Sequence, residues 1–192
     1  MTSSTRPERG QKTVAILAAV WRVVAAQGLG AVSFRSVARE AGVSPGRVQH
    51  YFASKEELVR ASVDLMLGSA EALHRDATAT ADPADELWQL LTHAIPRAAE
   101  SPVGTGVFYS FVAASVADPQ IARALAEAKQ GARREIAALL HELRARSDDA
   151  SASAQELLAM SDGVTLGVLI GSLTPDQARA TLRGALDRLL GS

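Results

Sequence analysis

Five times along this chain, a residue whose side chain can cap a helix stands directly before a proline. The pairs are Ser44-Pro45, Asp82-Pro83, Ser101-Pro102, Asp118-Pro119 and Thr174-Pro175. A serine, threonine or aspartate oxygen can accept a hydrogen bond from the free N–H groups of the first helical turn. Proline suits the first helical position because it needs no partner for an N–H and its φ angle is already helical. Each pair therefore predicts the start of a helix.

The stretches between these starts carry apolar residues at the three- and four-residue spacing of helices, without the alternation typical of strands. Alanine, the residue with the lowest cost in a helix, fills 37 positions, whereas aromatic residues make up 4% of the chain. The sequence therefore predicts an all-α fold of about nine helices. The expected helices cover residues 12–27, 34–41, 45–51, 55–80, 83–100, 102–116, 119–146, 152–172 and 175–190.

The composition removes several classes of protein from consideration. No cysteine occurs, so disulfides, thiolate metal sites and cysteine nucleophiles are excluded. No run of about eighteen apolar residues is present, and residues 1–12 lack the apolar core of a secretory signal. With a mean hydropathy of +0.07, we expect a soluble, cytoplasmic protein that does not contact a membrane.

Charge is distributed unevenly along the chain. Residues 1–60 carry nine Arg or Lys and four Glu, a balance of +5, whereas residues 61–192 carry eleven basic and seventeen acidic side chains, a balance of −6. Such an asymmetry is typical of a chain whose basic part meets a polyanion. Chance scatter of surface charge is the alternative, and the charge count alone does not separate the two.

The two short helices expected at 34–41 and 45–51 are joined by a turn that contains Gly42, as in a helix-turn-helix motif. Glycine can adopt the left-handed conformation that ends the first helix. Val48 and Phe52 lie four residues apart and are expected to face inward. The outer face of the second helix then presents small residues, hydrogen-bond donors and flat rings, which suit the major groove of DNA. These residues are Pro45, Gly46, Arg47, Gln49, His50 and Tyr51.

About fifty residues resemble the DNA-binding domain of the tetracycline-repressor (TetR) family. The likeness begins at Ile16-Leu17, continues through Gly28-Leu29, and is dense from Ser33 to Leu58. Its most specific part is His50-Tyr51-Phe52 followed by Lys55-Glu56-Glu57-Leu58. The resemblance implies a DNA-binding transcriptional regulator, acting as a repressor at the nucleoid and released from a palindromic operator by a small-molecule ligand.

The resemblance also implies which residues contact DNA. Ser33 and Arg35 match phosphate-binding positions, and Lys55 would add a charge at a helix N-terminus that favours phosphate. Arg47 either reads a guanine or holds a phosphate, and the ring of Tyr51 either reaches DNA or packs on the first helix. The complete expected set is Ser33, Arg35, Ser44, Pro45, Gly46, Arg47, Gln49, His50, Tyr51 and Lys55. Pro45, Arg47 and Gln49 depart from the residues common in the family, so the resemblance does not predict the operator sequence.

The expected organisation has three parts. Residues 1–10 are small, polar and unpatterned and predict a flexible arm, which either dips into the minor groove or stays free. The DNA-binding domain is expected at 11–57, and the resemblance implies a ligand-binding and dimerisation domain at 58–192. Part of that domain, around Met160–Leu166 and Leu173–Ala178, is similar to the C-terminal domain of BetI-type members, a likeness that does not transfer their ligand.

A homodimer through the last two helices follows from the family resemblance and from a stripe of glycines. Residues 163, 167 and 171 are glycines four apart, which would lie on one face of the helix at 152–172 and let another helix approach closely. The stripe would pack either against a second subunit or inside the chain. The expected interface consists of Gly163, Gly167, Ile170, Gly171, Leu182, Leu186 and Leu189.

A ligand pocket is expected among the larger apolar side chains of the second part, although each stands at a spacing that also suits the core. The candidates are Met66, Trp88, Leu91, Phe108, Phe111, Val112, Met160 and Thr165. No convergent charged cluster identifies the ligand.

The sequence predicts neither an enzyme nor a cofactor or metal site. The four histidines, at 50, 74, 93 and 141, show no metal-ligand spacing such as H-E-x-x-H, and no nucleophile elbow, P-loop or dinucleotide fingerprint occurs. A purely protein-binding helical module is the remaining alternative. It leaves unexplained why the basic charge coincides with the helix-turn-helix.

Overall fold

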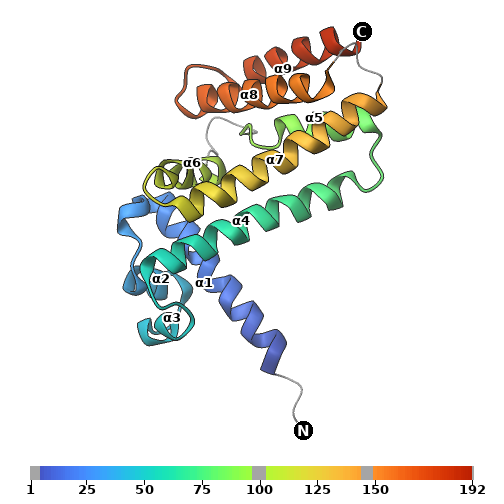
Figure 1. Ribbon diagram of the computed structural model, residues 1–192. Coiled ribbons are helices and arrows are strands. Elements are labelled where there is room, and N and C mark those ends of the chain that lie inside the picture. The colour runs from blue at the N-terminus through green and yellow to red at the C-terminus, as the bar shows by residue number, and fades with distance from the viewer. Residues whose placement is uncertain (1–4, 97–102, 144–148, 192) are drawn as a thin grey trace. The chain divides into compact units, whose positions relative to one another are not determined.

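The computed structural model describes residues 5–96, 103–143 and 149–191, and within these ranges the chain is helical with no strand (Figure 1). The all-α prediction is confirmed. The helices are α1 (Thr5–Gln27), α2 (Phe34–Ala41), α3 (Pro45–Tyr51), α4 (Lys55–Thr78), α5 (Pro83–Thr92), α6 (Val103–Ser115), α7 (Pro119–Glu142), α8 (Ala150–Leu169) and α9 (Pro175–Leu190), with a short 3-10 helix, η1 (Leu29–Ala31).

The chain divides into two compact units. Unit 1 comprises Met1–Ser69 and Gly106–Leu125, and unit 2 comprises Ala70–Thr105 and Ala126–Ser192. Three helices, α4, α6 and α7, therefore begin in one unit and end in the other. Each unit has a hydrophobic core of its own.

The core of unit 1 gathers the apolar faces of its helices. Ile16, Val20 and Val23 of α1 are buried together with side chains from α2, α3, α4, α6 and α7; these include Val37, Val48, Leu58, Phe111 and Ile121. The indole Nε1 of Trp21 on α1 donates a hydrogen bond to the carbonyl of Ser62 on α4 at 3.0 Å. Burying this apolar surface is the main contribution that holds α2 and α3 on α1.

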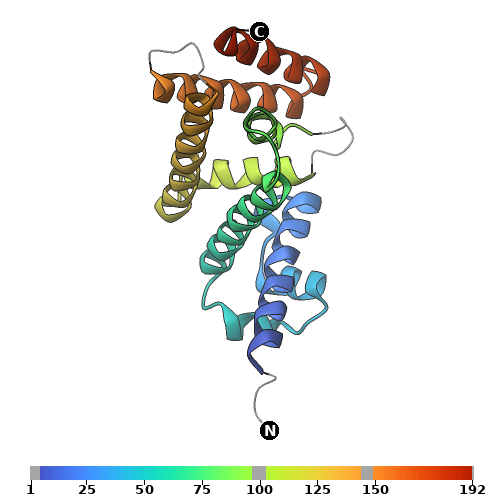
Figure 2. The ribbon, with the colours of Figure 1, turned by 90° about the vertical axis from the view of Figure 1, so that its right-hand side faces the viewer.

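The core of unit 2 is built from α5, α7, α8 and α9. Its largest fully buried side chains are Leu87, Leu91, Ile136, Leu140, Leu157, Leu182 and Leu186. The hydroxyl of Ser161 donates to the carbonyl of Leu91 at 2.6 Å, which links α8 to α5. The helices α8 and α9 run side by side (Figure 2).

The expected bounds of α2, α3 and α9 are confirmed, whereas those of α1, α5 and α8 are wrong by several residues at one end. Helix α1 begins at Thr5, so residues 5–10 of the expected arm are helical; residues 1–4 lie outside the described part. Pro7 does not prevent this, because N–H groups of the first turn have no helical partner to lose. Helix α5 ends at Thr92 instead of 100. Pro96 has no N–H to donate to the carbonyl of Thr92 and disfavours the helical conformation of the residue before it.

Helix α8 also ends earlier than expected, and this changes the glycine stripe. Its last residue is Leu169, and Gly171 has a φ of +76° in the turn that follows. The N–H groups of Ser172 and Leu173 both donate to the carbonyl of Gly167, at 2.9 and 3.1 Å. Gly171 therefore makes the turn toward α9 and is not part of a helical face.

Candidate nucleic-acid interface

The start of α2 is fixed by two serines. The backbone N–H of Ser36 donates to Ser33 Oγ at 3.1 Å, and the N–H of Ser33 donates to Ser36 Oγ at 2.9 Å. The Ser36 hydroxyl also donates to the carbonyl of Ala31 at 2.8 Å, which ties η1 to the same point. These bonds satisfy orphan N–H groups at the helix start, so the first residues of α2 have one defined position.

The turn between α2 and α3 depends on Gly42. Its φ of +67° and ψ of 31° lie in the left-handed region, which a residue with a Cβ adopts only at a cost. The N–H of Val43 then donates to the carbonyl of Ala38 at 2.9 Å, closing the end of α2. Ser44 Oγ accepts from the N–H of Arg47 at 3.3 Å and caps α3, and Val48 anchors α3 in the core with no exposed surface.

All ten expected DNA-contacting residues lie within unit 1. Nine belong to α2, α3 (Figure 1) or their N-caps, and Lys55 is the first residue of α4. Eight are exposed: Ser33, Arg35, Ser44, Pro45, Gly46, Arg47, Gln49 and His50. Tyr51 and Lys55 are partly buried. The ring of Tyr51 packs against the core of unit 1 and meets the His50 ring edge-on, with centroids 5.5 Å apart.

Arg39 was missed by the sequence interpretation. It is exposed on α2 one turn after Arg35, so the two side chains lie on the same face of the helix. Their spacing of four residues was visible in the sequence and could have identified the pair. Arg22, in contrast, forms an ion pair with Glu40 at 2.6 Å, which neutralises its charge locally.

The N-terminus of α4 is capped by the chain itself. Ser54 Oγ accepts from the N–H of Glu57 at 3.0 Å, and Glu57 Oε2 accepts from the N–H of Ala53 at 2.7 Å. Hydrogen bonds from its own backbone N–H and from the Ser54 hydroxyl lower the pKa of Glu56. Two carboxylates therefore occupy this helix terminus. The contribution of Lys55 to phosphate binding is consequently its own charge, which lies beside the carbonyl of Gly30 at 3.5 Å.

Behind this surface, an ion pair connects α4 to the start of α7. Arg60 Nε donates to Asp118 Oδ2 at 2.8 Å, while Asp118 Oδ1 accepts from the N–H of Gln120 at 3.0 Å and caps α7. The hydrogen bond from Arg60 is the main cause that lowers the pKa of Asp118. One carboxylate thus holds two helices of unit 1.

The expected ligand-pocket residues are divided between the two units. Met66, Phe108, Phe111 and Val112 belong to unit 1, and Trp88, Leu91, Met160 and Thr165 belong to unit 2. Phe111 and Leu91 are fully buried core residues. The guanidinium of Arg183 covers the Trp88 ring at 3.8 Å from its centroid. Only the hydroxyl of Thr165 has the character of an anchor, since it is buried with no hydrogen-bond partner in the described part of the chain.

The expected dimer residues divide into buried and exposed members. Leu182 and Leu186 lie inside the core of unit 2 and are withdrawn from any outer face. Gly167 is also buried, and an added Cβ would lie 2.8 Å from Leu173 Cδ1, so it packs inside the chain. Leu189 is partly buried. Gly163 and Ile170 are exposed on and just after α8, with Leu166 between them.

Two protein families account for most of the chain. Residues 16–62 match the bacterial regulatory proteins of the tetR family, and residues 83–191 match the C-terminal part of the BetI-type transcriptional repressor. The chain belongs to the TetR family. Members of this family are DNA-binding regulators and not enzymes, as the sequence predicted. No helix in the described ranges is long and apolar enough to cross a membrane.

Individual relatives and solved structures are similar to this chain over nine tenths or more of its length. The HTH-type transcriptional regulator BetI of Rhizobium meliloti is 32% identical, over 92% of this chain and 94% of its own length. The regulator PksA of Bacillus subtilis is 26% identical, over 90% and 84%. A transcriptional regulator from Rhodococcus sp. Rha1 has a TM-score of 0.82 at 25% identity, over 93% of this chain and 96% of that one. One from Saccharomonospora viridis, solved in complex with choline, has a TM-score of 0.83 at 23% identity, over 93% and 96%.

Proposed function

We propose that this TetR-family regulator is a repressor that binds a near-palindromic operator as a homodimer at the nucleoid and leaves it when a small molecule binds. The observation that carries the proposal is the exposed face of α3, held by the capped α2–turn–α3 unit. Its polar side chains are exposed toward solvent while Val48 fixes the helix from behind.

The position of each residue on or near this face indicates the role that we propose for it in DNA binding. Ser44, which caps α3, and Pro45, Gly46 and Gln49 on α3 itself would approach bases. The absence of a side chain at Gly46 leaves room for close contact. Flexible cations around this helix would hold phosphates, which receive most hydrogen bonds in protein–DNA complexes. These cations are Arg35, Arg39, Arg47 and Lys55, with Ser33 as a neutral donor.

A dimer supplies the second recognition helix. The seven residues of α3 cover one half-site, and two half-sites bring the buried surface into the range of specific complexes. Gly163, Leu166 and Ile170 offer an exposed apolar strip for a symmetric contact, with Leu166 43% and Ile170 69% exposed. Isolated apolar residues are normal on a surface, but three at helical spacing fit an interface.

The effector would bind in unit 2, to which the BetI-type match belongs in large part. Choline, present in the complex of the Saccharomonospora protein, is the first compound to test. The chemistry of unit 2 gives it limited support. A quaternary ammonium group prefers an open aromatic face, and one face of Trp88 is covered by Arg183. Binding that favours one of two conformations would shift the population away from the operator-bound state.

Selection of bound duplexes from a random DNA library tests the proposal directly. Purified protein at physiological salt is expected to enrich one near-palindrome. Retention without an enriched sequence, lost as salt rises, would reduce the function to nonspecific polyanion binding. The enriched duplex then serves for titrations with and without choline.

A charge-matched pair of variants tests the site. Arg47→Ala/Lys55→Ala is expected to weaken operator binding and to reduce the slope of log affinity against log salt by about two, because each phosphate contact contributes about one. Arg123→Ala/Arg134→Ala removes the same charge from exposed positions on α7 and should leave affinity nearly unchanged. Equal losses in both variants would mean that general charge, and not the α3 surface, binds DNA.

A further inference from the structure

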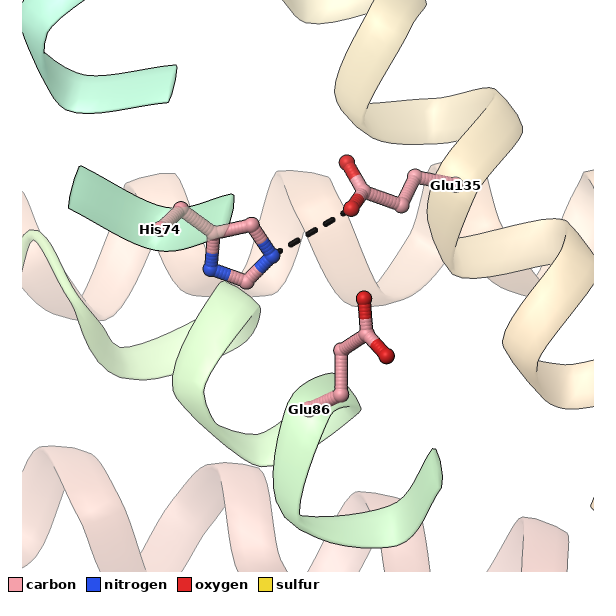
Figure 3. A group of neighbouring side chains, drawn as sticks. All are labelled: His74, Glu86 and Glu135. Atoms are coloured by element: carbon pink, nitrogen blue, oxygen red, sulfur yellow. Dashed lines mark ion pairs between the residues drawn. The ribbon is translucent and has the colours of Figure 1, made fainter. Parts of the chain in front are cut away.

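Three side chains with metal-binding atoms converge in unit 2 from three helices. His74 comes from the last part of α4, Glu86 from the first turn of α5, and Glu135 from α7. One ligand atom from each lies within 4.8 Å of the other two. Figure 3 shows the imidazole and the two carboxylates directed toward a common space between the helices.

The imidazole of His74 is mostly buried. Its side chain is 14% exposed, and Nε2 lies 3.2 Å from Glu135 Oε1. The Nε2 atom itself is buried and has no partner with hydrogen-bond geometry in the described part of the chain. The Glu135 side chain is 42% exposed, so the cluster can be reached from solvent.

Charge makes this arrangement costly without a cation. Two carboxylates a few ångström apart repel each other, and a protonated imidazole can neutralise only one of them. A divalent cation bound by a neutral imidazole and two carboxylates leaves the group without net charge.

We propose that His74, Glu86 and Glu135 form a binding site for a divalent transition-metal ion, with Zn²⁺ as the best match. One nitrogen and two oxygen ligands are a donor set that Zn²⁺ uses, with water at the fourth position, whereas Mg²⁺ prefers oxygen ligands alone. A tetrahedral Zn²⁺ ion needs its ligand atoms about 3.4 Å apart. Rotations within the two flexible glutamate side chains can close the remaining gap from 4.8 Å.

The bound ion would cross-link α4, α5 and α7 inside unit 2. At this point α4 and α7 are otherwise joined by the His74–Glu135 pair, a single weak ion pair that does not include α5. The ion binds the folded state only, so it would raise the stability of the protein by mass action. The inference goes beyond DNA binding and holds whichever operator the protein recognises.

The test uses the full-length protein after treatment with a chelator that is then removed. ZnCl₂ is titrated in competition with a chromophoric chelator, and binding of one Zn²⁺ per chain is expected. His74→Gln and Glu135→Gln are each expected to lower the Zn²⁺ affinity at least tenfold. In other metal sites, mutation of residues that only hydrogen-bond to the ligands already lowers metal affinity by about 10–100-fold. MgCl₂ at the same concentration should not compete.

A matched control separates the site from general binding to His and Glu. His141→Gln/Glu142→Gln removes the same residue types from exposed positions on α7 and should leave the Zn²⁺ affinity unchanged. Thermal unfolding gives a second readout, since Zn²⁺ should raise the Tm of the wild type and of the control, but not of His74→Gln. If His74→Gln does not fold, Glu86→Gln, in the first turn of α5, is measured in its place.

Two results would overturn the inference. Zn²⁺ binding that is unchanged in His74→Gln and Glu135→Gln would place the metal elsewhere, and no Zn²⁺ binding by the wild type would reduce the cluster to an ion pair. Operator binding, measured on the same metal-free samples, keeps a failure here distinct from a failure of the DNA-binding proposal.

Discussion

The two units differ in how their buried polar groups are paired. In unit 1, most polar residues of α2 and α3 are exposed, and the buried hydroxyls of Ser36 and Ser62 both donate to backbone carbonyls. In unit 2, the buried Thr165 hydroxyl and His74 Nε2 have no hydrogen-bond partner in the described part of the chain, while Ser161 donates inside the core. A rigid apolar core that presents a polar outer face suits a large partner such as DNA. Buried polar groups suit a small ligand or an ion that the protein surrounds.

Truncating one core leucine in each unit should produce the largest effects. Leu58→Ala in unit 1 and Leu182→Ala in unit 2 both remove fully buried side chains, at an expected cost of about 2–5 kcal/mol each. Hydrogen exchange of the two variants should show where protection is lost. We expect the loss to be concentrated in the unit that carries the substitution; equal loss across both units would mean that they unfold as one.

Gly42→Ala should have the next largest effect, because it places a residue with a Cβ in the left-handed conformation at φ +67°. The expected loss of stability is about 1–2 kcal/mol, measured by urea unfolding, together with weaker operator binding. Gly46→Ala is the informative companion. Its added Cβ meets nothing within 4 Å in the described structure, so stability should hold or rise by up to about 1 kcal/mol. If Gly46→Ala bound the operator as well as the wild type, close approach at this position would be wrong.

The same difference explains how far the sequence could predict the molecule. The bounds of α2 and α3 depend on neighbours within a few residues, such as the Ser33–Ser36 and Ser44–Arg47 caps. Local rules could therefore find them. The His74, Glu86 and Glu135 cluster joins residues from three helices, and no local spacing reveals it.

The errors in unit 2 have the same origin. The glycine spacing at 163, 167 and 171 predicted that all three lie on one face of a helix, but in the structure each glycine has a different environment. Gly163 is exposed, Gly167 packs against Leu173, and Gly171 makes the turn. Only the tertiary contact with Leu173 and the end of α8 at Leu169 separate these roles.

Substitutions of two of these glycines should have effects of about 1 kcal/mol with opposite signs. Gly163→Ala has open space around its Cβ, so it should stabilise α8 by up to about 1 kcal/mol. Gly167→Ala would press on Leu173 Cδ1 at 2.8 Å, and overpacking should outweigh the gain in helix propensity by about 1 kcal/mol. Sedimentation of Gly163→Ala then tests the proposed dimer: if two α8 helices approach closely at Gly163, dimerisation should weaken while the fold becomes more stable.

The smallest expected effects concern pH, and they predict which of the two units loses stability first as the pH falls. Burial lowers the pKa of His93 in unit 2, with further lowering from His74 and Lys129 and opposition from Asp162 and the Leu90 carbonyl. The unfolded chain takes up a proton at His93 near pH 6.5, while the folded chain resists it, so stability falls as the pH drops below that value. In unit 1, the pKa of Asp118 is lowered from its ordinary value of 3.8. Below that pH the unfolded carboxyl is protonated before the folded one, so stability falls as the pH drops further.

Acid should therefore weaken unit 2 before unit 1. Tm measured from pH 8 to pH 3 is expected to decline first below about 6.5, and His93→Gln should flatten that part of the profile without changing the part below 4. Asp118→Asn should flatten only the lower part, because it keeps an oxygen to cap α7 but loses the charge that faces Arg60. A His93→Gln profile parallel to that of the wild type would show that the imidazole is solvated. His93 would then not be a buried polar group that distinguishes unit 2 from unit 1.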